Sequence, residues 1–312
     1  METDPQSRPR GPRALGTTRQ GRQPCRRSGS SPAAHAGLGR AIAEAALARG
    51  DRVAATARDP RTLEDLVAGS GGPAVALKLD VTDPAQAAAA VQAAVNAFGW
   101  IDVVVNAGYA NFQSIEDFTE EDFRAQVETD LWGVVHVTRA ALPVLRAQRD
   151  GHVIQISSIG GRTTTPGLAP YQLSKFAVEG FSGVLLKEVA PLGIRVTVIE
   201  PGGIRTDWAG SSMTMHEIRG DYQASVGVMA RMLQGNGPGT AAGDPGKMAR
   251  AILRVADAEN PPVQLPLGSD AVMLARAADE ARLAELARWE ELSLSTDADD
   301  APERDLSALA QP

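Results

Sequence analysis

The sequence predicts an α/β fold in which helices cover both faces of one parallel sheet. From residue 37 onward, segments with helical periodicity alternate with short, continuous apolar runs. A strand that is buried on both faces reads as a continuous apolar run, whereas a strand with one solvated face alternates with polar residues. The alternation of helices with buried strands is typical of a doubly wound parallel sheet, here within a single domain.

The predicted elements follow one another in a regular order. We expect strands at residues 53–57, 74–79, 103–105, 153–156, 195–199 and 263–267. We expect helices at residues 40–49, 62–69, 84–98, 120–147, 170–189 and 244–256. The fourth helix should break at Pro143, because proline removes a helical hydrogen bond. This order is that of a Rossmann-like fold, whose ligands bind beyond the carboxyl ends of the strands.

Both ends of the chain differ in composition from its middle. Residues 1–30 carry seven arginines against two acidic residues and lack apolar periodicity, which predicts a disordered tail. We predict one folded domain over residues 31–292 and a disordered acidic tail over residues 293–312. Within the domain, residues 208–240 hold Trp208 and several methionines among glycine and serine, and we interpret them as a mobile apolar lid. A pair of packed surface helices is the alternative.

Composition excludes several classes of function. The net charge of -7 gives no support for nucleic-acid binding, and no apolar run approaches the length of about 18 residues that a membrane span needs. The single cysteine, Cys25, forms no internal disulfide and fits a reducing compartment. The four histidines lack metal-ligand spacing. We therefore expect a cytoplasmic protein that acts on small molecules without a metal.

Tyr171 and Lys175 lie four residues apart in the helix predicted over residues 170–189. Side chains at this spacing share one face of a helix, so the Lys175 ammonium should lie beside the Tyr171 phenol. A free phenol has a pKa of about 10, and a neighbouring ammonium lowers that pKa by stabilising the phenolate. The pair is a candidate acid/base, with chance spacing as the alternative.

Ser158 comes thirteen residues before Tyr171, just past the strand predicted over residues 153–156. Sites in a doubly wound sheet are built at this end of the strands. A hydroxyl there can hydrogen-bond a substrate carbonyl and stabilise a developing oxyanion. The alternative is that Ser157 and Ser158 form only a polar turn.

These residues resemble the active-site signature of the short-chain dehydrogenase/reductase family, which is a serine, twelve residues, and then Tyr-x-x-x-Lys. Three other segments resemble further motifs of the family, in the same order along the chain. They are Asp80-Val81 (adenine contact), Asn106-Ala107-Gly108 (sheet stabilisation) and Pro201-Gly202 through Thr206 (nicotinamide and pyrophosphate loop). The resemblance covers about residues 37–290. It implies that Tyr171 transfers a proton, that Lys175 lowers its pKa and holds the nicotinamide ribose, and that Ser158 orients the substrate.

The end of the strand predicted over residues 53–57 indicates which cofactor binds. Sites that select NAD usually place a carboxylate there, on the ribose 2′-hydroxyl, whereas sites that select NADP place a cation. Here Arg58 follows the strand and can pair with a 2′-phosphate, with assistance from Arg40, while Asp59 comes one position too late. We therefore expect NADP, with NAD less favoured. The alternative is that Arg58 is only a solvated loop residue.

The glycine-rich loop departs from the family pattern Thr-Gly-x-x-x-Gly-x-Gly. When the pattern is aligned on Gly37 and Gly39, its first two positions meet Pro32 and Ala33. No apolar run precedes the loop, so the first strand of the sheet is predicted to be missing or degraded. Either residues 1–36 come from an out-of-frame or mis-started translation, or the protein lacks the strand and binds its cofactor poorly or not at all.

Asp130 stands where the family usually has asparagine, whose backbone carbonyl supports a water-mediated proton relay to the lysine. The backbone of Asp130 can still serve in this way. Its carboxylate, however, favours the charged form of Lys175. We therefore count Asp130 among the catalytic candidates and expect it to shift the pH dependence of activity.

The sequence thus favours an NADP(H)-dependent oxidoreductase, acting on CH–OH donors, that interconverts a carbonyl and an alcohol on a small, hydrophobic substrate. The candidate cofactor-binding residues are Gly37, Gly39, Arg40, Arg58, Asp80, Val81, Asn106, Gly108, Tyr171, Lys175, Pro201, Gly202 and Thr206. The resemblance also implies a homodimer or homotetramer formed through the long helices. The alternative function is that of a cofactor-free remnant of the family, acting as a binding or regulatory protein.

Overall fold

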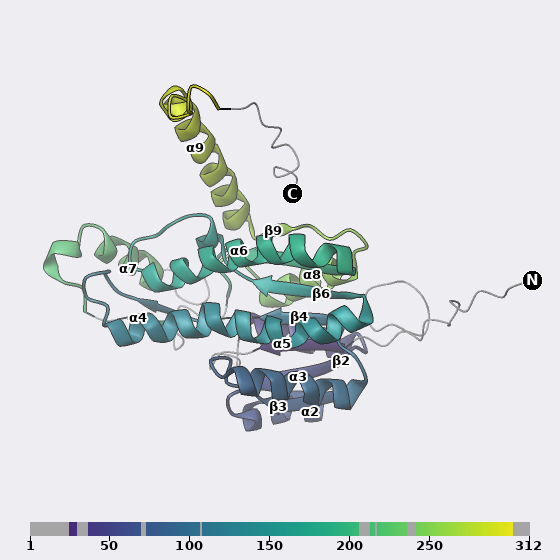
Figure 1. Ribbon diagram of the computed structural model, residues 1–312. Coiled ribbons are helices and arrows are strands. Elements are labelled where there is room, and N and C mark those ends of the chain that lie inside the picture. Colours follow the sequence, from purple (N-terminus) through teal and green to yellow (C-terminus); the bar gives the residue numbers. More distant parts are fainter. Residues whose placement is uncertain are drawn as a thin grey trace, which may run out of the picture.

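The computed structural model describes residues 25–29, 37–69, 73–106, 108–205, 213–215, 217–235 and 241–301. Within these residues, seven parallel strands form one sheet in the order β3-β2-β1-β4-β6-β7-β9 (Figure 1). The strands are β1 Cys25–Gly29, β2 Arg52–Ala57, β3 Ala74–Lys78, β4 Val103–Asn106, β6 Gly151–Ile156, β7 Ile194–Pro201 and β9 Gln264–Leu267. The predicted doubly wound parallel sheet is confirmed.

Helices pack on both faces of this sheet (Figure 1). The α-helices of the described residues are α1 Leu38–Ala48, α2 Glu64–Gly69, α3 Pro84–Phe98, α4 Glu120–Val127, α5 Gly133–Gln148, α6 Ala169–Val189, α7 Val226–Gly235, α8 Pro245–Asp257 and α9 Ser269–Leu294. In β4, Val103 and Val105 join the core beneath α1 and α8, whereas Val104 joins the core beneath α3, α5 and α6. This burial on both faces explains the continuous apolar runs of the sequence.

The central position of the sheet is occupied by β1. This strand pairs in parallel with β2 on one side and with β4 on the other. The prediction of a missing first strand is therefore wrong, and residues 25–29 do not belong to the tail predicted over residues 1–30. The apolar-run criterion failed because ladder hydrogen bonds come from the backbone, which a strand containing arginine and serine supplies equally well. Pro32 and Ala33 lie outside the described residues.

The long helix predicted over residues 120–147 is divided at a different place from the one expected. A π-helical turn at Glu128–Trp132 separates α4 from α5, and α5 continues through Pro143. The predicted break at Pro143 is wrong. This proline is exposed, so water can satisfy the backbone carbonyl that loses its helical partner. The π turn places Asp130 in the interior, and such turns are frequent at functional sites.

The segment predicted as a lid is described in part. β8 Met213–Met215 pairs with β5 Ala110–Phe112 in a small second sheet, and α7 follows. Trp208 lies outside the described residues. Beyond α8 and β9, the helix α9 projects away from the body of the protein and ends two residues inside the predicted acidic tail (Figure 1). None of the helices in the described ranges is both long enough and apolar enough to cross a membrane.

Candidate active site

The candidate catalytic residues meet at the carboxyl end of the sheet. Ser158 follows β6 and caps the short helical turn Ile159–Gly161, while Tyr171 and Lys175 lie on α6. Asp130 comes from the π-helical turn between α4 and α5. Three separate segments therefore deliver the four predicted catalytic side chains to one place.

Tyr171 is held as a protonated phenol. The Ser158 hydroxyl hydrogen-bonds the phenol, and its oxygen also accepts the Gly160 N–H at 3.0 Å. Burial raises the pKa of Tyr171 above its ordinary value, Asp130 acts in the same direction, and the hydrogen bond from Ser158 opposes them. The resemblance implies instead that Lys175 lowers this pKa. The Lys175 Nζ lies 5.5 Å from the centre of the Tyr171 ring.

Lys175 and Asp130 form a buried pair of opposite charge beside Gly108. The Lys175 Nζ donates to the Ile156 carbonyl at 2.9 Å, and Asp130 Oδ1 accepts the Tyr109 N–H at 3.0 Å. A Cβ at Gly108 would lie 2.3 Å from Asp130 Oδ1, so the site requires glycine there. Burial raises the pKa of Asp130 to about 6 and lowers the pKa of Lys175, and each charge opposes the change in the other.

The amino end of α1 fits the pyrophosphate of a dinucleotide. Gly37 is the N-cap residue and provides no side-chain cap for the first N–H groups of the helix. Around Gly39, no atom of the described residues lies within 4 Å of the point where a Cβ would stand. Uncapped amides and the helix dipole together attract phosphate.

The two predicted arginines of the cofactor site differ in their surroundings. Arg40 is paired with Glu44 at 2.8 Å and also with Asp65. Arg58, directly after β2, is exposed and makes no hydrogen bond or ion pair within the described part of the chain. Arg40 is thus committed to two carboxylates, whereas Arg58 has no such partner among the described residues.

The other predicted cofactor residues lie at or just after the carboxyl ends of three strands, β3, β4 and β7. Asp80 Oδ1 accepts the Thr82 N–H at 3.0 Å in the turn after β3, and Val81 is buried beside it. Asn106, the last residue of β4, donates to Gln155 of β6 at 2.9 Å and thereby ties the two strands together. Pro201 ends β7 and Gly202 follows it, whereas Thr206 lies outside the described residues.

Comparison with known proteins identifies the family. A model of the short chain dehydrogenase family matches residues 33–217. The chain belongs to the short-chain dehydrogenase/reductase family. The oxidoreductase BOA17 of Botryotinia fuckeliana is 51% identical over 262 residues, which cover 83% of this chain and 95% of that relative.

Solved structures agree with this assignment. A short-chain dehydrogenase from Streptomyces avermitilis has a TM-score of 0.81 and 37% sequence identity, with 88% of this chain and 100% of that chain covered. A short-chain dehydrogenase from Burkholderia cenocepacia, solved in complex with NADP, has a TM-score of 0.65 and 25% identity, with coverages of 85% and 96%. This short-chain dehydrogenase is therefore an oxidoreductase with the fold that its sequence predicts.

The described part of the predicted lid packs against Tyr171. Val226 of α7 shares a buried cluster with Phe112 and Tyr171. Arg219, just before α7, pairs with Glu116 on the facing loop at 2.6 Å. This short-chain dehydrogenase thus has an apolar wall beside its candidate acid/base, and an ion pair fastens the wall to the rest of the domain.

Gln126, which is not among the residues predicted from the sequence, organises the Asp130 end of the site. Its Nε2 donates to the Tyr109 carbonyl at 2.8 Å and to Asp130 Oδ2 at 3.3 Å, while its Oε1 accepts the Asn111 N–H at 3.1 Å. Gln126 comes four residues before Asp130 in a helical segment. That spacing, which predicts a shared helix face, was the available signal.

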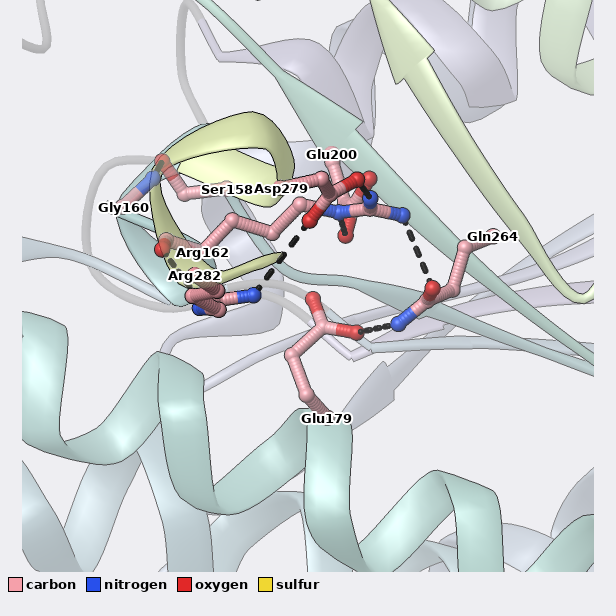
Figure 2. Close-up of polar contacts among 8 residues, drawn as sticks. All are labelled: Ser158, Gly160, Arg162, Glu179, Glu200, Gln264, Asp279 and Arg282. Carbon is pink, nitrogen blue, oxygen red and sulfur yellow. Dashed lines mark hydrogen bonds and ion pairs between the residues drawn. The ribbon is translucent and has the colours of Figure 1, made fainter. Parts of the chain in front are cut away.

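A second group of polar residues behind Ser158 was also missed (Figure 2). Arg162 is its centre and pairs with Glu200, a fully buried carboxyl group at the end of β7, at 2.7 Å. Glu179 lies four residues after Lys175 on α6 and joins the group through Gln264, which donates to it at 2.9 Å. The signals in the sequence were the spacing of Glu179 from Lys175 and the position of Glu200 directly before Pro201-Gly202.

Proposed function

We propose that this short-chain dehydrogenase is an NADP(H)-dependent reductase that converts a carbonyl group on a small hydrophobic molecule into an alcohol, and catalyses the reverse oxidation. The observation that carries the proposal is the buried, protonated Tyr171, hydrogen-bonded to Ser158. A protonated phenol next to a hydroxyl is suited to donate a proton to a carbonyl oxygen. The raised pKa of Tyr171 keeps the phenol at neutral pH in the protonated form that the reduction requires, whereas the oxidation requires the phenolate as base.

The protein's own residues would handle the proton and the developing charge. When bound, the nicotinamide supplies the hydride for the carbonyl carbon. Ser158 and Tyr171 hold the carbonyl oxygen by hydrogen bonds, and Tyr171 donates its proton as negative charge develops there. The Lys175 ammonium stabilises the phenolate that remains, and the ionised Asp130 carboxylate helps to keep Lys175 charged.

Three observations support NADP as the cofactor, the first because it fits any dinucleotide and the other two because they favour NADP over NAD. The amino end of α1 presents uncapped amides for the pyrophosphate. Arg58 is an unpaired cation within the described ranges, at the end of β2 where the adenosine ribose is bound in this fold class. The relative from Burkholderia cenocepacia was solved with NADP. A 2′-phosphate on Arg58 would gain a charge-assisted hydrogen bond that NAD cannot offer.

The substrate class follows from the wall beside Tyr171. Phe112, Leu168 and Val226 are buried in the same cluster as Tyr171. Such a wall favours apolar groups on either side of the reacting carbonyl, because burying them releases water from apolar surface. We propose a hydrophobic ketone, aldehyde or secondary alcohol as the substrate.

We further propose that two or four copies assemble through the outer face of α6. Leu173 and Val184 are 52% and 60% exposed, and Phe176 lies on the same face between them. At Gly180 and Gly183 an added Cβ would meet no described atom within 4 Å, so another helix can approach α6 closely there. A second copy of α6 would cover this apolar row.

The first test is a fluorescence titration of the full chain with NADPH and, separately, with NADH. We expect tighter binding of NADPH, followed by NADPH consumption with members of a panel of hydrophobic ketones and aldehydes. A cofactor-free remnant would bind neither dinucleotide, and that result would refute the proposal. The presence of β1 at the centre of the sheet removes the missing strand as a reason to favour the remnant.

A further inference from the structure

Arg162 joins four elements behind the candidate active site (Figure 2). Its Nε donates to Glu200 Oε1 on β7 at 2.7 Å. Its two terminal nitrogens contact Asp279 Oδ2 on α9 at 2.9 Å and Gln264 Oε1 on β9 at 2.8 Å. Arg282, also on α9, donates to the backbone carbonyl of Arg162. The guanidinium thus connects the turn after β6, which carries Ser158, to β7, β9 and α9.

A second carboxyl group completes this cluster. Glu179 of α6 accepts a hydrogen bond from Gln264 at its Oε2 and lies within hydrogen-bonding reach of Glu200. Ionised carboxylates can only accept hydrogen bonds, so a bond between the two groups requires one proton. Within the described part of the chain, Glu179 Oε1 and Glu200 Oε2 are both buried without another hydrogen-bond partner. Two buried carboxyl oxygens without other partners in this cluster would allow Glu179 and Glu200 to share one proton.

More carboxyl groups than cations lie around Glu200 and Arg162. The facing charged groups are Arg162 from the turn after β6, Glu179 from α6, and Asp279 and Arg282 from α9, while Gln264 of β9 is neutral. Burial and Glu179 raise the pKa of Glu200 to about 7, and Arg162 opposes them. With both carboxyl groups ionised, Arg162 would face three carboxylates, one of which, Asp279, also contacts Arg282 at 3.4 Å.

The cluster is directly connected to the loop after β7. Glu200 precedes Pro201, the last residue of the strand, and Gly202 follows. On the far side of this loop, the Gly203 N–H donates to Asp270 Oδ2 at 2.7 Å in the first turn of α9. The loop is therefore held at Glu200, through Arg162, and at Gly203, and both attachments lead to α9.

We propose that Glu200 is a positioning residue for the cofactor loop after β7, and that it acts as a one-proton carboxyl pair with Glu179 on Arg162. While the proton is shared, the pair draws the end of β7 toward α6 and fixes the Pro201-Gly202 turn. When the proton leaves to solvent, the two carboxylates repel and the turn loosens. The effect on cofactor affinity rests on the proposed function, whereas the shared proton does not.

The shared proton can be tested without any cofactor. The full chain, labelled with ¹³C at its glutamate carboxyl groups, would be titrated by NMR between pH 5 and pH 9. We expect one glutamate to titrate near pH 7, this signal to be absent in Glu200→Gln, and the signal to move to lower pH in Glu179→Gln, which removes one cause of the raised pKa. Glu188→Gln, an exposed position on the same helix, should retain the signal. If no glutamate of the wild type titrates above pH 6, the carboxyl pair is refuted, whether or not the variants fold.

The positioning role is tested by NADPH affinity as a function of pH. Loss of one proton can weaken wild-type binding by up to about tenfold per pH unit as the pH rises through the titration. Each glutamine variant imitates the proton-sharing state, so its affinity should stay at the wild-type value of pH 6. The NADPH affinity of Glu188→Gln should change with pH as the wild-type affinity does. The 2′-phosphate of NADPH, whose pKa is about 6, ionises in every titration, so its contribution is the same in all variants.

The outcomes separate the two proposals. Glutamine variants that bind NADPH with the wild-type pH dependence, whether more weakly or equally well, would refute the positioning role. If one glutamine variant fails to fold, the other decides. A wild type that binds no NADPH at any pH refutes the proposed function instead, while the NMR titration still decides whether Glu179 and Glu200 share a proton.

Discussion

Replacing Asp130 by asparagine measures how strongly burial acts on this carboxyl group. Folding raises the pKa of Asp130 from 3.8 to about 6, because burial outweighs the Lys175 ammonium and the hydrogen bonds from Tyr109 and Gln126. An acid with a raised pKa binds its proton more tightly in the folded chain. The free energy of unfolding therefore falls as the pH rises from about 4 to about 6. A tenfold change in proton affinity equals about 1.4 kcal/mol, so this carboxyl group costs about 3 kcal/mol at pH 7.

Asparagine does not ionise and should remove this decline. It keeps an acceptor for the Tyr109 N–H, but its amide faces the Gln126 Nε2 donor, and losing that hydrogen bond costs about 1–3 kcal/mol at every pH. The difference between Asp130→Asn and wild type should therefore move by about 2.4 kcal/mol in favour of the variant between pH 4 and pH 7. Glu200 titrates equally in both proteins, so its contribution cancels.

Urea denaturation followed by circular dichroism at pH 4, 5, 6 and 7 gives these free energies directly. Glu121→Gln, an exposed acid on α4, is the matched control and should differ from wild type by a constant amount. A difference between Asp130→Asn and wild type that changes by less than about 1 kcal/mol over this range would refute the raised pKa. Loss of the carboxylate should also lower the pKa of Lys175, so the alkaline limb of the activity profile should move to lower pH.

Three further predictions concern catalysis, cofactor choice and assembly. Tyr171→Phe should lower turnover by about 10²–10⁴-fold and leave the NADPH dissociation constant nearly unchanged, so near-wild-type rates would exclude Tyr171 as the acid/base. Arg58→Asp should change the ratio of catalytic efficiencies with NADPH and NADH by about tenfold or more toward NADH, since a charge-assisted contact contributes about 1.5–3 kcal/mol; an unmoved ratio would make Arg58 a solvated loop residue. The double variant Leu173→Asp, Val184→Asp should sediment as a smaller species than wild type, and unchanged sedimentation would place the interface elsewhere.

Local chemistry made most of the fold predictable. Asp83, Thr119 and Asp244 each cap the helix that follows, and their side chains accept backbone N–H groups in the structure. The buried strands lie close to the predicted apolar runs, because both faces of the sheet are covered. Ser158, Tyr171 and Lys175 were predictable for a similar reason, since their spacing reflects one strand end and one helix face.

The missed features depend on pairings between distant residues. Arg162 contacts Glu200 and Asp279, which are 38 and 117 positions away in the sequence. No sequence periodicity connects such residues. Taken singly, each of them is interpreted as a solvated surface charge. The direction of the Tyr171 pKa was missed for a related reason. Spacing predicts which residues are neighbours, but desolvation depends on everything that covers the phenol, including the segment around Phe112 and Val226.

The strand β1 supports a last prediction, about stability. Arg26 lies opposite Val53 and Val103, and Arg27 lies opposite Ala54 and Val104, and all four of these partners are at most 2% exposed. A parallel strand between such neighbours normally carries apolar residues, since a buried valine contributes about 1.5–3 kcal/mol. The double variant Arg26→Val, Arg27→Val should therefore raise the free energy of unfolding by about 2 kcal/mol or more, which corresponds to several degrees in melting temperature.

Paired thermal melts of the double variant, the wild type and the control Arg61→Val would test this prediction. Arg61 is exposed at the start of a helical turn, so its replacement removes a positive charge without changing the sheet. If charge alone limited stability, Arg61→Val would gain about half as much as the double variant. If an apolar residue is favoured at this place in the sheet, only the double variant gains. A double variant that melts at or below the wild-type temperature would mean that valine at these two positions finds no apolar surroundings, and that the sheet is held there by its backbone hydrogen bonds alone.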